Sequence, residues 1–114
     1  MRLRIDTSEN KFRVAALAQP RARSRTDQTQ KTTPDGRPVW AVKLTATDTG
    51  SNSVEMIWVE VAGDEPKLTF DGYASVRGLV FAPWVGRDGK IKRSFRADAI
   101  EPAAAPSGKP AQAA

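Results

Sequence analysis

In this 114-residue chain, residues 39–61 read VWAVKLTATDTGSNSVEMIWVEV and give the clearest indication of the fold class. Both ends of the stretch are rich in β-branched and aromatic residues and alternate in polarity, which is typical of β-strands. Between them, Asp48–Asn52 is a short polar segment with the composition of a turn. The stretch therefore predicts a β-hairpin with strands over 39–47 and 54–61.

The same period of two continues on both sides of this hairpin. It predicts a first strand over 12–17 ended by Pro20, a fourth over 73–85 bent at Gly78 and Pro83, and a fifth over 90–100 stopped by Pro102. Gly86–Gly89 has the composition of a hairpin turn between the last two strands. No long segment keeps a helical period, and a single turn around 66–68 is the one helical alternative. The predicted fold is all-β, a five-stranded barrel like the oligonucleotide-binding (OB) fold.

The length suits one domain, which we expect to span residues 1–102. Residues 103–114, AAAPSGKPAQAA, cannot bury enough apolar surface to offset their ordering entropy, so we expect a disordered tail there. No apolar run approaches the roughly 20 residues of a membrane span, and the N-terminus has no secretory pattern. A cytoplasmic protein that does not bind membranes is the expectation.

Cysteine and histidine are both absent from the sequence. Their absence excludes disulfides, zinc sites built on thiolate or imidazole, thiol nucleophiles and histidine bases. The alternation along the third strand places Glu55 and Glu60 on different faces, and no set of carboxylates converges as a two-metal site requires. We expect these acids to be solvated on the surface, and we expect neither enzymatic activity nor a cofactor.

The net charge of +5 is distributed unevenly along the chain. Residues 1–43 hold ten Lys/Arg against four Asp/Glu, residues 44–85 hold two against six, and residues 86–114 hold six against three. Five of the ten Lys/Arg of the first block lie in the loop over residues 20–38, which joins the first two predicted strands and has no large apolar side chain. We expect this loop to be exposed to solvent, and a loop of this length in a compact domain is usually functional or disordered.

In an OB fold, ligands lie across the second and third strands and between the loops that join strands one to two and four to five. The two positive blocks fall on these loops, which indicates a groove for an anionic chain. Because Lys and Arg neutralise phosphates and aromatic faces stack on unpaired bases, the expected ligand is single-stranded DNA. A solvated loop without a partner is the alternative. The expected nucleic-acid-binding residues are Arg21, Arg23, Arg25, Lys31, Arg37, Trp40, Lys43, Trp58, Trp84, Arg87, Lys90 and Lys92.

Among the aromatic residues, Trp58 falls on the polar face of its strand and is the leading candidate for stacking on a base. Trp40 shares its face with Val42 and Leu44, so a core position is the stronger interpretation for it. Trp84 and Tyr73 are further stacking candidates, and Phe12, Phe70 and Phe95 are expected in the core.

Several short motifs occur in order between Thr32 and Pro102. They are Gly36-Arg37-Pro38 before an aromatic residue, Pro66-Lys67-Leu68-Thr69, Gly72-Tyr73, Arg77-Gly78-Leu79 and the closing segment from Phe95 to Pro102. With this order the chain resembles the gene V protein type of single-stranded-DNA-binding protein from filamentous phage, and similar small proteins of actinomycete integrating plasmids and phages. The resemblance implies an OB-like barrel, a homodimer, and cooperative coating of single-stranded DNA, without sequence preference, during replication or transfer of a mobile element.

Two other functions remain open at the level of sequence. The chain could be a small β-barrel adaptor that binds protein, with basic loops that keep it soluble. It could also be an RNA-binding variant of the same fold. Phosphate binding weakens steeply with salt, whereas an apolar protein interface responds little, so salt dependence separates the adaptor from the nucleic-acid binders.

Overall fold

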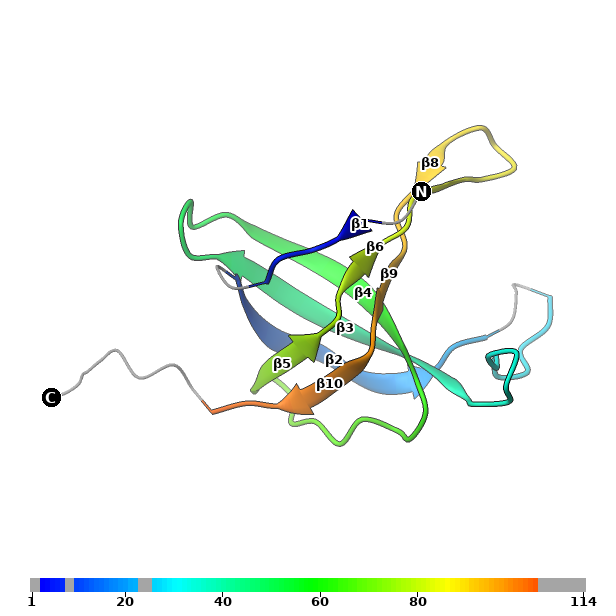
Figure 1. The fold of residues 1–114 in the computed structure, drawn as a ribbon, viewed down its shortest axis with the longest axis horizontal. Coiled ribbons are helices and arrows are strands. Elements are labelled where there is room, and N and C mark those ends of the chain that lie inside the picture. Colours follow the sequence, from blue (N-terminus) through cyan, green and yellow to red (C-terminus); the bar gives the residue numbers. More distant parts are fainter. Residues whose placement is uncertain (1–2, 8–9, 23–25, 105–114) are drawn as a thin grey trace, which may run out of the picture.

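The computed structural model describes residues 3–7, 10–22 and 26–104. In this part of the chain the fold is all-β, with no helix, and the helical alternative around residues 66–68 is therefore wrong. The strands are β1 (Leu3–Arg4), β2 (Asn10–Pro20), β3 (Val39–Asp48), β4 (Val54–Ala62), β5 (Tyr73–Arg77), β6 (Val80–Phe81), β7 (Trp84–Val85), β8 (Ile91–Lys92), β9 (Phe95–Ala97) and β10 (Ala99–Pro102). Figure 1 shows the strongly twisted sheet that most of them form.

Eight strands belong to one mixed sheet in the order β1-β6-β9-β4-β3-β2-β5-β10, and β7 with β8 forms a second, two-stranded sheet. Among the described strands, only the β4–β9 pair is parallel. Long β2 bends at two register shifts, and it pairs with β3 along its length and with β5 through Phe12 and Arg13. Phe12 and Arg13 therefore use one edge of β2 for β3 and the other edge for β5.

The hairpin predicted from residues 39–61 is confirmed. β3 and β4 pair antiparallel from Val39 opposite Ala62 to Thr47 opposite Val54. In the connecting turn the Asp48 side chain accepts a hydrogen bond from the backbone of Gly50 (2.9 Å), and Asn52 has a positive φ of 60°. Asn tolerates this left-handed conformation better than most residues.

The predicted fourth and fifth strands are present in pieces. β5 and β6 are separated at Gly78 and Leu79, while β9 and β10 are separated at Asp98. Both bends meet in space, because the backbone N–H of Asp98 donates to Arg77 (2.8 Å), and a Cβ added at Gly78 would lie 2.2 Å from the Asp98 carboxylate. With φ at +67°, Gly78 is therefore required both by backbone conformation and by close approach.

The core is built from the inward faces of β2, β3 and β4, with contributions from β5 and β10. Its fully buried side chains are Val14, Val42, Leu44 and Val59. Phe12 is buried and Phe95 packs against the cluster, as expected, but the expectation for Phe70 is wrong because its side chain is 65% exposed. Phe70 lies in the irregular segment between β4 and β5, where no strand alternation directs a side chain inward.

Short β1 is an element that the sequence pattern does not predict. It pairs with β6, and Ile5 just after it packs against the core. A two-residue strand has no measurable periodicity, so only its partner strand identifies it.

Candidate nucleic-acid interface

The centre of the candidate site is a cross-strand pair on the outer face of β3 and β4. Lys43 and Trp58 are register partners, and the Lys43 ammonium lies 5.8 Å from the centre of the Trp58 ring. Trp58 is 45% exposed, while its strand neighbours Ile57 and Val59 are buried on the opposite face. The alternation predicted for this strand is thus confirmed, and it places the half-exposed Trp58 ring beside the half-buried Lys43.

The basic loop over residues 20–38 begins and ends in backbone pairing. The N–H of Arg21 donates to Val39 (3.0 Å), that of Lys31 donates to Arg21 (2.6 Å), and that of Val39 donates to Lys31 (2.9 Å). The side-chain amide of Gln30 adds a bond to the Val39 carbonyl (3.0 Å). Many of the loop's described side chains are exposed, as expected, but its base is an ordered extension of the sheet, and Val39 and Ala41 are buried beside it.

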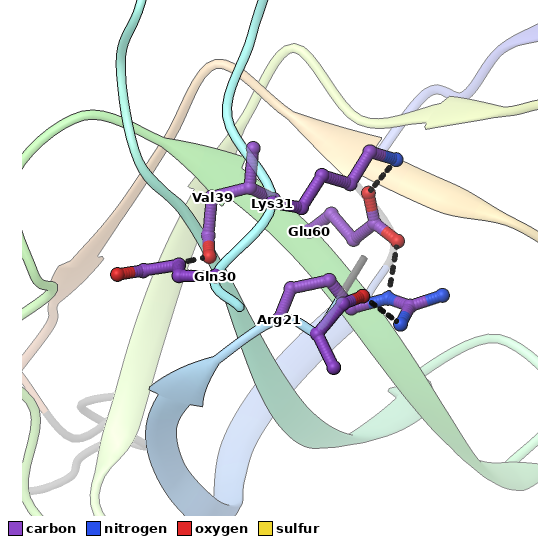
Figure 2. A network of polar contacts seen from close by, with 6 residues as sticks. Arg21, Gln30, Lys31, Val39 and Glu60 are labelled. Atoms are coloured by element: carbon purple, nitrogen blue, oxygen red, sulfur yellow. Dashed lines mark hydrogen bonds and ion pairs between the residues drawn. The ribbon is translucent and has the colours of Figure 1, made fainter. Parts of the chain in front are cut away.

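Glu60 on β4 joins this loop base to the outer face of the sheet. Its two carboxylate oxygens accept hydrogen bonds from Arg21 Nε (2.9 Å) and Lys31 Nζ (3.3 Å), and Figure 2 shows the two cations meeting on this one carboxylate. Only 16% of the Glu60 side chain is exposed. The expectation of a solvated acid is therefore wrong for Glu60, because the loop folds back and supplies two partners from sequence positions 29 and 39 residues away. Glu55 is 53% exposed and pairs with Arg93.

A tight turn over Thr33–Arg37 forms the outer part of the described loop. Gly36 has φ of +89° and donates its N–H to the Thr33 carbonyl (2.9 Å), while the Thr33 hydroxyl accepts from the Arg37 backbone (3.0 Å). The Thr33 hydroxyl also donates to Asp35, and Arg37 Nε binds the same carboxylate (3.1 Å). The Thr33 hydrogen bond and then the Arg37 hydrogen bond and charge hold the pKa of Asp35 below its ordinary value.

The second basic segment is the β7–β8 hairpin, which projects from the sheet in Figure 1. Trp84 pairs with Lys92, so a second exposed tryptophan and a second lysine share one face of two strands. Lys92 Nζ also binds Asp88 (3.3 Å). Arg87 and Lys90 at the turn are exposed, and neither forms an ion pair with another described residue.

The two remaining aromatic candidates, Trp40 and Tyr73, already contact other residues of the protein. Trp40 is partly buried against the core, and its indole N–H donates to the Gly63 carbonyl (3.0 Å), which agrees with the core interpretation. The ring of Tyr73 has the Arg13 guanidinium 5.1 Å from its centre, and this guanidinium binds Asp71. Trp58 and Trp84 are therefore the tryptophans that the structure leaves available for stacking.

Of the predicted site residues, Arg23 and Arg25 lie outside the described residues. Two basic residues on the outer face of the sheet were not predicted: Arg96 on β9, and Arg13 on β2, whose register partner on β3 is Thr45. β9 pairs with β4, and Arg96 is the register partner of Glu60. The parallel β4–β9 pairing carries Arg96 to this face, and no local sequence pattern reveals a parallel partner 36 residues away.

Within residues 3–7, 10–22 and 26–104, no group of three or more acidic residues is arranged to hold a metal ion. The same part of the chain has no helix with the length and hydrophobicity to cross a membrane. Comparisons with protein-family models, with curated proteins and with solved structures found no match to this chain, so its function is inferred from its own residues.

Proposed function

We propose that this protein binds single-stranded DNA without sequence preference and is not an enzyme. The observation that carries the proposal is the Lys43–Trp58 pair on the outer face of β3 and β4, in which a half-buried lysine lies 5.8 Å from the centre of a half-exposed tryptophan ring. A tryptophan face stacks on any base, and a neighbouring ammonium can neutralise the phosphate of the same nucleotide. The pair therefore has the two chemical elements of sequence-tolerant recognition.

We also propose that the strand pairings describe a five-stranded OB-like barrel. If β5–β6 and β9–β10 are each treated as one bent strand, the neighbours become β2-β3-β4-β9/β10-β5/β6 and then β2 again. The parallel β4–β9 pair and the β2–β5 pair support this closure. In this arrangement β3 and β4 are the second and third strands, on which OB folds bind nucleic acid, and the 21–38 and 86–90 turns are the flanking loops.

The length of the face supports a short binding track. On β4 this face runs from Met56 through Trp58 to Glu60, which holds Arg21 and Lys31, whereas Glu55 and its partner Arg93 belong to the opposite face. Five residues of extended strand span about 17 Å. At roughly 6–7 Å per nucleotide of stretched single strand, this corresponds to about two or three nucleotides, with Trp58 near the middle. Lys43 on β3 supplies a further cation on this face, and the β7–β8 hairpin carries Arg87, Lys90 and Lys92.

The biological setting that we propose follows from the resemblance to the gene V protein type. It is cooperative coating of single-stranded DNA by a homodimer during replication or transfer of a mobile element. The edge strands β1 and β10 at the two ends of the sheet support self-association, because an edge presents unpaired backbone groups. RNA binding by the same face is the alternative, and a comparison of oligo-dT with oligo-U would detect it.

A protein-binding function is the second candidate, favoured by one observation. In the β7–β8 hairpin Trp84, Val85 and Ile91 are 55%, 67% and 74% exposed, which is an unusual concentration of apolar side chains in solvent. Such a hairpin could dock on an apolar surface of another protein. Changing Val85 and Ile91 together to serine would abolish that interaction and leave the Lys43–Trp58 pair in place.

Fluorescence titration of the tryptophans with oligo-dT, oligo-U and duplex DNA at two salt concentrations tests the proposed function. We expect oligo-dT to quench the emission and bind more tightly than duplex, with an affinity that falls log-linearly with salt. Equal affinity for oligo-U would indicate an RNA-tolerant site. Absence of binding to every oligonucleotide at low salt would contradict the proposal and leave the protein-binding candidate.

A further inference from the structure

A cavity of about 340 Å³ lies where the base of the basic loop meets β4, β9 and the bend at Gly78. Ligand pockets in proteins usually measure about 300–1,000 Å³, so this one suits a ligand of the size of a single nucleotide. It lies beyond Trp58 along β4, since Glu60, Val61 and Ala62 form part of its wall. The cavity is thus distinct from the Lys43–Trp58 stacking surface and adjacent to it.

The charged lining of this cavity is suited to an anion. Lys31 and Arg37 enter from the loop and Arg96 from β9. Arg96 is exposed and forms no ion pair with any described residue, so its guanidinium retains all its donors. Glu60 also lines the cavity, but Arg21 and Lys31 occupy both its oxygens and offset its charge. Arginine is the side chain best matched to phosphate, which it binds through two parallel N–H groups.

The rest of the lining is suited to an apolar ring and a sugar. Val39 and the half-buried Val80 line the cavity, together with Val61 and Ala97, whose side chains pack in or against the core. The carboxylate of Asp98 and the hydroxyl of Thr32 add polar groups at the rim. A base can pack on the apolar part while Asp98 accepts a hydrogen bond from a sugar hydroxyl or a ring N–H.

We propose that this cavity binds one nucleoside monophosphate unit, with the phosphate on Arg96 and the base against Val39 and Val80. The unit can be a free mononucleotide or one nucleotide of a bound strand. Binding of one nucleotide of a longer strand rests on the proposed function. Glu60 lies two residues after Trp58 on β4, about 7 Å away. A DNA strand stacked on Trp58 would therefore bring its next nucleotide to the cavity.

Calorimetric or NMR titration of the full chain with dTMP, thymidine and inorganic phosphate tests the site. We expect dTMP to bind at least tenfold more tightly than either of its parts, because both portions of the cavity are then used. Arg96→Ala should weaken dTMP binding at least tenfold, and Arg96→Lys should weaken it less. Arg77→Ala is the matched control: Arg77 is an exposed arginine outside the cavity, paired with Glu101, and its removal should change nothing. Equal binding of dTMP and phosphate, or an unchanged affinity in Arg96→Ala, would overturn the site. Unaltered circular dichroism and melting temperature establish that the variants fold.

Competition between dTMP and oligo-dT separates the two sources of the nucleotide. If a strand uses the cavity, saturating dTMP should weaken oligo-dT binding several-fold, and Arg96→Ala should remove this effect. If dTMP binds without competing, the cavity is a site for free nucleotide. If the parent protein binds oligo-dT but not dTMP, the proposed nucleotide site in the cavity is overturned and the proposed function is not. Binding of dTMP without any binding of oligo-dT would overturn the proposed function alone.

Discussion

The ammonium of Lys43 lies 5.8 Å from the centre of the Trp58 ring, and the two residues face each other across the β3–β4 ladder. This relationship places a cation and an aromatic face within one nucleotide's reach of each other on the outer face of the sheet. A cation–π contact of this kind contributes about 0.5–1 kcal/mol at an exposed site. The proposed binding of a nucleotide base to the Trp58 ring leads to the first prediction.

Replacing Trp58 by alanine should weaken oligo-dT binding by about 1–3 kcal/mol, or roughly 5- to 150-fold, with little change in salt dependence. The variant removes a stacking face and no charge. Phe70→Ala is the matched control, because Phe70 is also a well-exposed aromatic but lies outside the site. Fluorescence anisotropy with a labelled oligonucleotide measures both. A Trp58→Ala protein that unfolds, or one that binds like the parent, would contradict the stacking role.

Replacing Arg21, Arg23 and Arg25 together by alanine should weaken binding and flatten the salt dependence. Each phosphate that is no longer neutralised lowers the slope of log affinity against log salt by about 0.7, so three such phosphates together lower it by about 2. The control is Lys67→Ala combined with Arg77→Ala, which removes exposed cations away from the site. An unchanged slope in the triple variant would mean that the loop only connects β2 and β3.

Glu60→Gln should increase the affinity for single-stranded DNA. The carboxylate occupies Arg21 and Lys31 as a phosphate would, and the backbone bonds at the loop base keep the loop in position without it. We expect a gain of about 1 kcal/mol, roughly fivefold, and a steeper salt slope. Thermal stability should fall slightly, because the variant removes two partly exposed ion pairs.

Glu101→Gln removes an equal charge from an ion pair remote from the site and serves as its control. If Glu60→Gln and Glu101→Gln increase the affinity for single-stranded DNA equally, the increase comes from the change in net charge alone. A loss of affinity in Glu60→Gln would show that the carboxylate positions the loop for binding.

The Asp35 carboxyl should titrate with a pKa below its ordinary value of 3.8. Because its pKa is lowered in the folded protein, the associated stabilisation of the 33–37 turn is present above pH 3.8 and is lost as pH falls through the lowered value. NMR titration of the side-chain carbon measures this. Thr33→Val removes the hydrogen bond that lowers the pKa of Asp35 most, so it should move this pKa toward 3.8. Thr32→Val leaves the Thr33 hydroxyl in place and should not change the pKa of Asp35.

Sedimentation velocity at micromolar concentration should show a dimer. The ends of the main sheet are the edge strands β1 and β10, and pairing or covering such edges is a common reason for self-association. A monomer at every concentration would leave nucleic-acid binding possible and would remove a main support for the resemblance to the phage proteins.

The local sequence pattern was sufficient to predict most of the strands. The β3–β4 hairpin, the outward position of Trp58 and the bends at Gly78 and Pro83 all follow from alternation and from Gly and Pro, which act over a few residues. The same alternation identified Trp40 as a residue that packs against the core. Where the chain has no period, as around Phe70 and β1, composition alone misplaced or missed the element.

The all-β fold class, the inward and outward faces of β3 and β4, and the separation of charge into blocks follow from residue order. Which cations remain free and which are paired depends on how the strands and loops meet in space. Glu60 meets Arg21 and Lys31 through loop folding, and Arg96 reaches the same face through the parallel β4–β9 pairing. Ion pairing depends on atoms within about 4 Å, and such distances between residues far apart in sequence are set by chain topology, which no local pattern encodes.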